Sequence, residues 1–509
     1  MSLARQILRG SMLSVAEQGV RAVAALVMTP VMVRCLGVAD FGLWGLVTAF
    51  FAQFGALDLG LQSSMPRFLL QRDDDERRGG ASTAMSLYGG VAVVGLVLTA
   101  IAWLVVPVFV HDVSRISTVR WVLVLLGASN ALSTGVRLLV IQVQCLMRQD
   151  LISSVAILRV VTCSAVLWWW LTERGGGLLA VGLVQAGGAM VEALALAWFG
   201  RSLLRDIARR WASKEAAKKL LRYTGWSYLY VTSERLRSGL DGFVLGWLRD
   251  SSAAGIYGLG LRPVAMVFDT VYAGIGMQLL PTFRQVHEGQ GHERLMAVFV
   301  VVTRLATRVA VIAAVLVLAV GLGFLKCWVP DHAMDAWPVL ACLALPLALQ
   351  TAQVPVVHLL FALAKHRPLA IAQAVAVALN LALSWVLAMH LGIVGAALGT
   401  AIEIALMHGI LVPLMVRRLA GISLGTFVGR GLLLPSMASL AGVLPVAWLS
   451  WHWLSSRGSW GDFLLASIIL TLWGVGCFLL LGGKRDWREL KDLIRPHGEE
   501  EHLPLPVQL

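Results

Sequence analysis

The chain has 509 residues, of which 58% are hydrophobic and only 14% are charged, and its formal net charge is +13. Soluble chains carry roughly 25% charged residues, so this composition cannot cover a globular surface and excludes a soluble protein. Apolar runs long enough to cross about 30 Å of hydrocarbon recur from one end of the sequence to the other. The sequence therefore predicts an all-α integral membrane protein.

These runs predict about fourteen transmembrane helices separated by short polar segments. In chain order they cover residues 12–34, 41–63, 82–108, 119–142, 151–171, 178–200, 223–246, 253–280, 298–324, 336–361, 368–390, 393–415, 430–451 and 461–481. The first run has no clear small-residue cleavage site, so we expect it to remain as a span and not to be removed as a signal peptide.

Loop charge predicts the orientation. Lysine and arginine concentrate in one alternating set of loops, which includes 201–222 and the tail from Lys484, whereas the opposite set holds few cations, such as Arg115 and Arg174. By the positive-inside rule both termini then lie in the cytoplasm. The net positive charge indicates contact with anionic membrane lipids and not with nucleic acid.

A short internal repeat indicates two helical lobes. Phe41–Leu46 reads Phe-Gly-Leu-Trp-Gly-Leu and Ala254–Leu259 reads Ala-Gly-Ile-Tyr-Gly-Leu, and both open an even-numbered predicted span. Six spans separate the copies, so they share an orientation, as parallel repeats related by a pseudo-two-fold axis do. We expect an N-terminal six-helix lobe with its basic inner linker at 1–222, a second six-helix lobe at 223–418, two peripheral helices at 419–481 and a cytoplasmic tail at 482–509.

No enzyme motif fits this organisation. Gly421–Gly425 has the Gly-x-Ser-x-Gly spacing of a nucleophile elbow, but that motif needs a preceding strand in an α/β sheet, and here it lies between two predicted spans. The six cysteines have no Cys-x-x-Cys spacing, and His287 and His292 lie among charges in an inner loop. We therefore predict no catalytic residue, metal site or cofactor.

Ionisable residues inside spans are the candidate functional residues, since each costs roughly 2.5–3.5 kcal/mol to insert and usually faces a cavity or a partner. Arg304 and Arg308 form an unpaired stripe in the predicted ninth span, and Glu17–Arg21 and Arg237–Asp241 are spaced as ion pairs that fix helix packing. The predicted lining of an anion-attracting cavity comprises Arg21, Arg235, Arg262, Arg304 and Arg308.

Several segments resemble bacterial polysaccharide-export flippases of the O-antigen type, in the multidrug/oligosaccharidyl-lipid/polysaccharide superfamily. Val33–Trp44 is similar to the opening signature of that family, and so is Leu57–Leu61 followed by Arg67-Phe68. Gly255–Tyr257 and Gly392–Ala397 stand where the family has similar stretches. The resemblance extends over most of the first 415 residues and is strongest in the first 70.

The resemblance implies alternating access between two facing lobes and a polyprenyl-diphosphate-linked oligosaccharide as substrate. The cargo would cross the bacterial inner membrane during surface polysaccharide biosynthesis, of lipopolysaccharide or exopolysaccharide, beside glycosyltransferases and a polymerase. Arginine suits a diphosphate because it binds bidentately and stays charged, and Arg21 and Arg262 are the first candidates. Carboxylates in spans that would exchange H⁺ or Na⁺ are Glu17, Asp241, Asp269 and Glu403.

Two alternatives stay open at this point. An ion-coupled multidrug exporter of the same fold would line its cavity with carboxylates and aromatic rings, whereas arginines outnumber acids within the predicted spans. A membrane-integral glycan-modifying enzyme would carry a sizeable outer loop with catalytic acids or histidines. The longest outer segment, around 325–335, is short.

Overall fold

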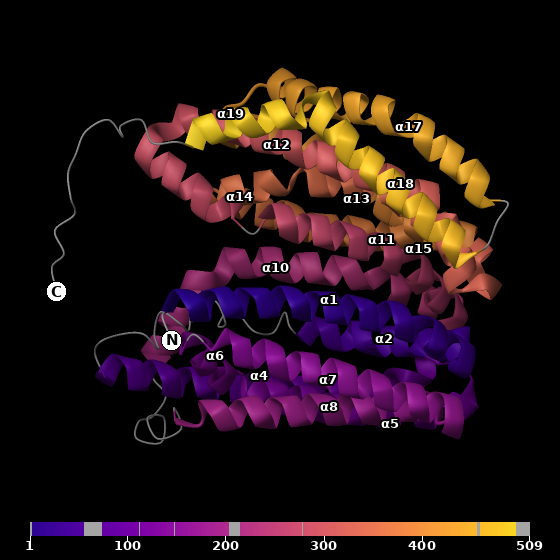
Figure 1. Cartoon of the computed structure of the whole chain (residues 1–509). Helices are drawn as coiled ribbons and strands as arrows, with labels where there is room; N and C mark the ends of the chain where they lie inside the picture. The colour runs from indigo at the N-terminus through magenta and orange to yellow at the C-terminus, as the bar shows by residue number, and fades with distance from the viewer. Residues whose placement is uncertain are drawn as a thin grey trace. The chain divides into compact units, whose positions relative to one another are not determined.

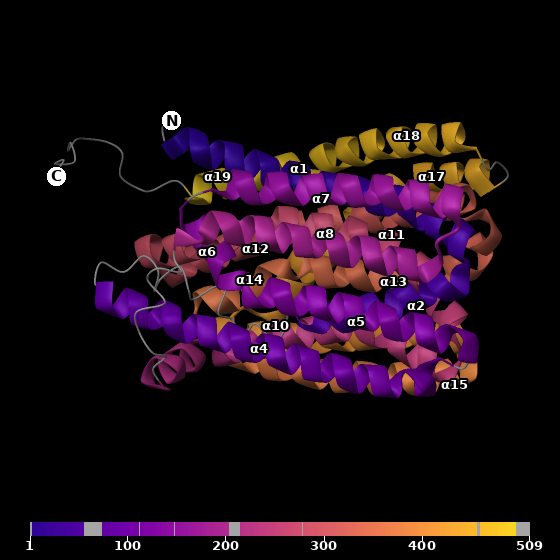
Figure 2. The same ribbon diagram turned by 90° about the horizontal axis from the view of Figure 1, so that it is seen from below.

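The structure, a computed structural model, describes residues 3–54, 74–110, 112–146, 148–202, 214–276, 278–455 and 459–494. Within these ranges all regular secondary structure is helical, and none of the described residues lies in a strand. Long helices run side by side, as α1, α7 and α8 do in Figures 1 and 2. The prediction of an all-α protein is confirmed.

The chain forms two compact units, Met1–Gly258 with Gln373–Ala396 and Leu259–Ala372 with Ala397–Leu509. The main helices before residue 250 are α1 (Leu3–Leu36), α2 (Val38–Phe54), α4 (Asp74–Phe109), α5 (Val113–Gly135), α6 (Arg137–Cys145), α7 (Gln149–Trp169), α8 (Gly177–Gly200) and α10 (Lys214–Leu248). Of these, α10 packs on α2 and α4. The domain limits drawn from the sequence stay predictions.

The main helices after residue 250 are α11 (Ser251–Gly276), α12 (Leu279–Trp328), α13 (Ala333–Ala352), α14 (Val354–Ala362), α15 (Arg367–Leu406), α16 (Val412–Ala420), α17 (Leu434–Ser455), α18 (Trp460–Phe478) and α19 (Lys484–Ile494). Two of them are broken by glycines with positive φ, Gly291 in α12 and Gly392 in α15. Glycine adopts this conformation without the steric penalty that a Cβ imposes. Both breaks lie between spans predicted as separate.

Ten helical segments of the described chain are long and apolar enough to cross a membrane. Ser251–Trp328 and Arg367–Ala420 each contain two predicted spans. The predicted spans 41–63 and 223–246 correspond to the shorter apolar helices Val38–Phe54 and Gly239–Leu248, and residues 55–63 lie outside the described ranges. The protein is therefore a multi-pass membrane protein, whereas the count of fourteen and the pseudo-two-fold stay predictions.

The two copies of the internal repeat meet at their glycines. A Cβ added to Gly42 of α2 would lie 1.7 Å from the carbonyl oxygen of Ser251, and one added to Gly255 of α11 would lie 2.4 Å from that of Val38. Only residues without a side chain let two membrane helices approach this closely. The repeated sequence thus marks a backbone-to-backbone crossing of α2 and α11.

We expect Gly42→Ala and Gly255→Ala to destabilise the protein by about 1–3 kcal/mol, as overpacking does, because each methyl group meets backbone that cannot rotate away. Gly45→Ala and Gly258→Ala are the matched controls on the same two helices, since a Cβ at either position has no heavy atom within 4 Å. Thermal unfolding of the purified variants in detergent measures the difference. Equal melting temperatures for variants and controls would contradict the close crossing.

Candidate functional site

A buried carboxylate joins three helices in the first unit. Asp241 of α10 is 6% exposed. One of its oxygens accepts a hydrogen bond from the Tyr257 hydroxyl of α11 (2.5 Å), and the other accepts from the Ser384 hydroxyl of α15 (2.7 Å). The Ser384 oxygen also lies 3.3 Å from the carbonyl oxygen of Ala396. Its single proton can serve only one of these acceptors at a time.

Two turns earlier on α10, a second polar group around Glu234 links α10 to α15. The buried Arg237 donates from Nη2 to Oε1 of Glu234 (2.8 Å). Gln373 of α15 donates from Nε2 to the other oxygen of Glu234 (2.5 Å). The sequence spacing indicated an ion pair of Arg237 with Asp241, and the structure shows an ion pair of Arg237 with Glu234. Together the two groups tie α10 to α15 through carboxylates.

Tyr257, Ser384 and Gln373 were not singled out from the sequence. Neutral polar side chains cost much less than charges in hydrocarbon, so they stand out weakly in a hydropathy profile. Tyr257 does lie inside the second copy of the repeat, two residues after Gly255. Its place in that repeat, and in the Gly255–Tyr257 stretch that resembles the flippase family, was the signal available from the sequence.

The other predicted site residues are distributed over α1, α10, α11 and α15. Arg21 is 43% exposed on α1 and donates from Nε and Nη2 to Oε1 of Glu17, at 3.0 and 2.8 Å, as the predicted ion pair. Arg235 is exposed, and its backbone carbonyl accepts a bond from the Gln53 amide (3.3 Å). Three further predicted site residues belong to the second unit. Arg262 is half-buried, Asp269 is exposed, and Glu403 is 1% exposed.

The prediction that Arg304 and Arg308 are unpaired is wrong. In the second unit, Asp486 of α19 bridges them, with Oδ1 3.2 Å from Nη1 of Arg304 and Oδ2 3.0 Å from Nε of Arg308. Glu489 adds a contact of 2.8 Å to Nη2 of Arg304. Hydropathy assigned these acids to a solvated tail, but the chain turns at Gly482 (φ +117°) and α19 lies along α12. Their role in binding substrate stays a prediction, and we leave both arginines out of the candidate site.

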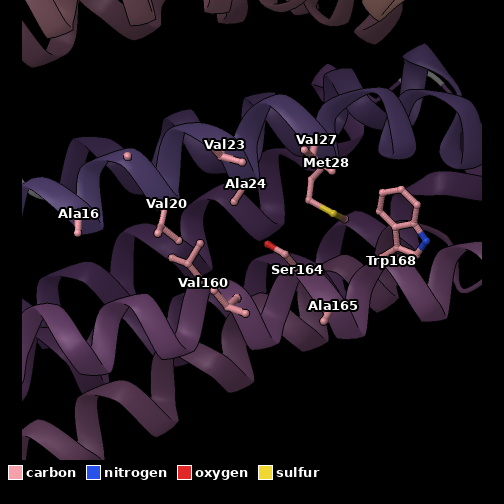
Figure 3. Close-up of a pocket in the computed structure, with 12 residues that line it drawn as sticks. Ala16, Val20, Val23, Ala24, Val27, Met28, Val160, Ser164, Ala165 and Trp168 are labelled. Atoms are coloured by element: carbon pink, nitrogen blue, oxygen red, sulfur yellow. The ribbon is translucent and has the colours of Figure 1, made fainter. Parts of the chain in front are cut away.

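An apolar groove of about 650 Å³ runs between α1 and α7 (Figure 3). Valines and alanines from both helices line it, with Met28 and Trp168 toward one end and Ser164 as the polar exception. Such a lining offers almost no hydrogen-bond donors, so it cannot stabilise a phosphate. It suits a hydrocarbon chain, whose burial needs only contact with apolar surface.

Residues 7–287, slightly more than half of the chain, match the family model described as polysaccharide biosynthesis protein. No curated protein matches the sequence.

Several solved structures share the fold. Lipid II flippase MurJ in an inward closed conformation superposes with a TM-score of 0.70 at 12% identity, covering 96% of this chain and 99% of that one. An inward-facing multidrug resistance MATE transporter of the MOP superfamily gives 0.58 at 15% identity, covering 87% and 96%. A MOP superfamily transporter from Pyrococcus furiosus gives 0.51 at 13% identity, covering 89% and 94%. The chain belongs to the polysaccharide biosynthesis protein family, and it has the fold of MOP superfamily membrane transporters.

Proposed function

We propose that this protein is a flippase that moves a polyprenyl-diphosphate-linked oligosaccharide from the inner to the outer leaflet of the bacterial inner membrane by alternating access. The observation that carries the proposal is membership of the polysaccharide biosynthesis family over residues 7–287. The fold that the chain shares with a lipid II flippase over 96% of its length supports it. In this role both termini face the cytoplasm, and glycosyltransferases and a polymerase of surface polysaccharide synthesis act on the same lipid-linked chain.

Asp241 is the carboxylate that we propose to bind the coupling ion, H⁺ or Na⁺. A buried carboxylate, two hydroxyls and a backbone carbonyl are all hard oxygen ligands of the kind that suits such a cation. An arriving ion competes with Tyr257 and Ser384 for the oxygens of Asp241, and these two residues come from different helices. Occupancy of the site therefore alters the contacts that hold α10, α11 and α15 together.

For the substrate, we propose separate places for the charged head and the lipid tail. Arg262 on α11 is half-buried, so it offers the diphosphate a cation in surroundings that screen it less than bulk water does. The apolar groove between α1 and α7 suits an isoprenoid chain by its lining. The two parts of the cargo differ so strongly in polarity that a single pocket could not stabilise both.

An ion-coupled multidrug exporter is the second candidate, because MATE transporters share the fold. Such a protein binds cationic amphiphiles and needs carboxylates with uncompensated charge in its cavity. In the polar cluster on α10, Glu234 is compensated by Arg237. This pairing makes Glu234 a poor site for a cationic drug.

Asp241→Asn should remove the dependence of transport on an imposed H⁺ or Na⁺ gradient, because a neutral amide cannot bind and release a cation with a change of charge. The measurement is movement of a fluorescent polyprenyl-diphosphate oligosaccharide between the leaflets of proteoliposomes. Asp269→Asn, at an exposed acid of α11, is the matched control and should keep the gradient dependence. The reverse result would move the coupling site to Asp269, and transport of a cationic dye in place of the lipid would support the exporter.

Arg262→Glu should abolish surface glycan export, since it places a like charge against the diphosphate. Arg262→Lys should lower export roughly tenfold, because a point charge replaces a bidentate fork and one charge-assisted bond is worth about 1.5 kcal/mol. Surface glycan is measured together with the amount of folded protein. If Arg262 served only to pair with Asp269, the swap of Arg262→Asp with Asp269→Arg would restore export fully, and that rescue would rule out the substrate contact.

A further inference from the structure

Helix α19 (Lys484–Ile494) sorts its charges by face. It follows the last apolar helix, α18, after only the five residues Leu479–Gly483, so it begins just beyond residue 481, the predicted end of the last span. Its acids Asp486 and Glu489 point toward α12, with Asp486 2% and Leu490 9% exposed. Its exposed residues are Lys484, Arg485, Trp487, Arg488, Lys491, Asp492 and Ile494.

Both ends of α19 are fixed to α12 (Figure 1). At the N-terminal end, Asp486 and Glu489 bind Arg304 and Arg308, as described above. At the C-terminal end, Arg294 donates from Nε to the carbonyl oxygen of Leu493 (3.1 Å) and from Nη2 to that of Asp492 (2.9 Å). The last carbonyls of a helix have no partner within it and carry partial negative charge, so an arginine there both satisfies and neutralises them.

This docking changes the charge that α19 presents to its surroundings. The helix holds four cations and three acids, so an isolated α19 would have a net charge of only +1. Because Asp486 and Glu489 are neutralised by arginines of α12, the outward face keeps four cations against the single acid Asp492. Trp487 lies among the cations, with Nζ of Lys491 5.7 Å from its ring, and tryptophan is the residue that favours the membrane interface.

We propose that the outward face of α19, made of Lys484, Arg485, Trp487, Arg488 and Lys491, binds the headgroups of anionic phospholipids and so holds the helix between the membrane surface and α12. The occupant follows from charge complementarity and from position, since each cation near an anionic surface contributes about 1 kcal/mol of attraction. The assignment is independent of the cargo proposed above. In this proposal Arg304 and Arg308 have a role other than substrate binding. They pair with Asp486 and Glu489, so that the outward face of α19 is mainly cationic.

The test is amide hydrogen exchange of residues 484–494 in the full-length protein, held in nanodiscs of phosphatidylcholine alone or of equal parts phosphatidylcholine and phosphatidylglycerol. We expect exchange in α19 to slow by about tenfold or more in the anionic discs, given four contributing cations, and the difference to shrink in high salt. Equal exchange in both lipids would overturn the proposal.

Variants locate the effect. A fourfold variant carries Lys484→Gln, Arg485→Gln, Arg488→Gln and Lys491→Gln. In this variant, exchange of α19 should no longer depend on the lipid. The amides of α12 should stay protected, which reports that the fold is intact. The matched control is Arg417→Gln with Arg418→Gln, which changes two exposed cations of α16 in the same unit. In this control, exchange of α19 should still depend on the lipid. Asp486→Asn should speed exchange of α19 in both lipids, because it removes the ion pairs of α19 with Arg304 and Arg308. Lipid dependence that survives the fourfold change, or that disappears in the α16 control, would overturn the assignment to α19.

Discussion

Hydrocarbon offers no hydrogen bonds, so every charged group that these helices bury must find its partner within the protein. That requirement accounts for the main polar contacts of the structure. Asp241 is satisfied by hydroxyls from α11 and α15, Arg159 of α7 by Glu192 of α8 at 2.6 Å, and Arg308 by Asp486. In each case the partner is on another helix, so a charge that is costly to bury also fixes which helices pack together.

The contact between α2 and α11 shows how a glycine helps a buried charged group to find its partner. Gly42 and Gly255 let the two backbones meet. Helix α10 packs against α2 within the same unit. Tyr257, two residues after Gly255, can then reach Asp241 on α10. A larger residue at either glycine would displace Tyr257 as well as the helix. The repeated Gly motif therefore positions part of the polar cluster, and packing and chemistry at this point cannot be changed independently.

Much of the fold could be predicted from the sequence because hydropathy is a local signal. The breaks at Gly291 and Gly392 lie between segments that the apolar runs predict as separate spans. The candidate site was less predictable for two reasons. Ser384 and Tyr257 are neutral, so no cost of burial marks them. The partner of Arg308 lies 178 residues away, beyond the last apolar run, and an amphipathic helix with mixed charges has the composition of a solvated tail. Only the turn at Gly482 brings it back.

These pairings change what a count of intramembrane charges can say about cargo. Arginines outnumber acids within the predicted spans, and from the sequence this excess indicated an anionic substrate. Arg21 is paired with Glu17, Arg237 with Glu234, and Arg304 and Arg308 with acids of α19 that the count of spans leaves out. A neutralised guanidinium attracts a diphosphate weakly, because the carboxylate already offsets its charge. The polarity of a transport cavity thus depends on pairing more than on composition.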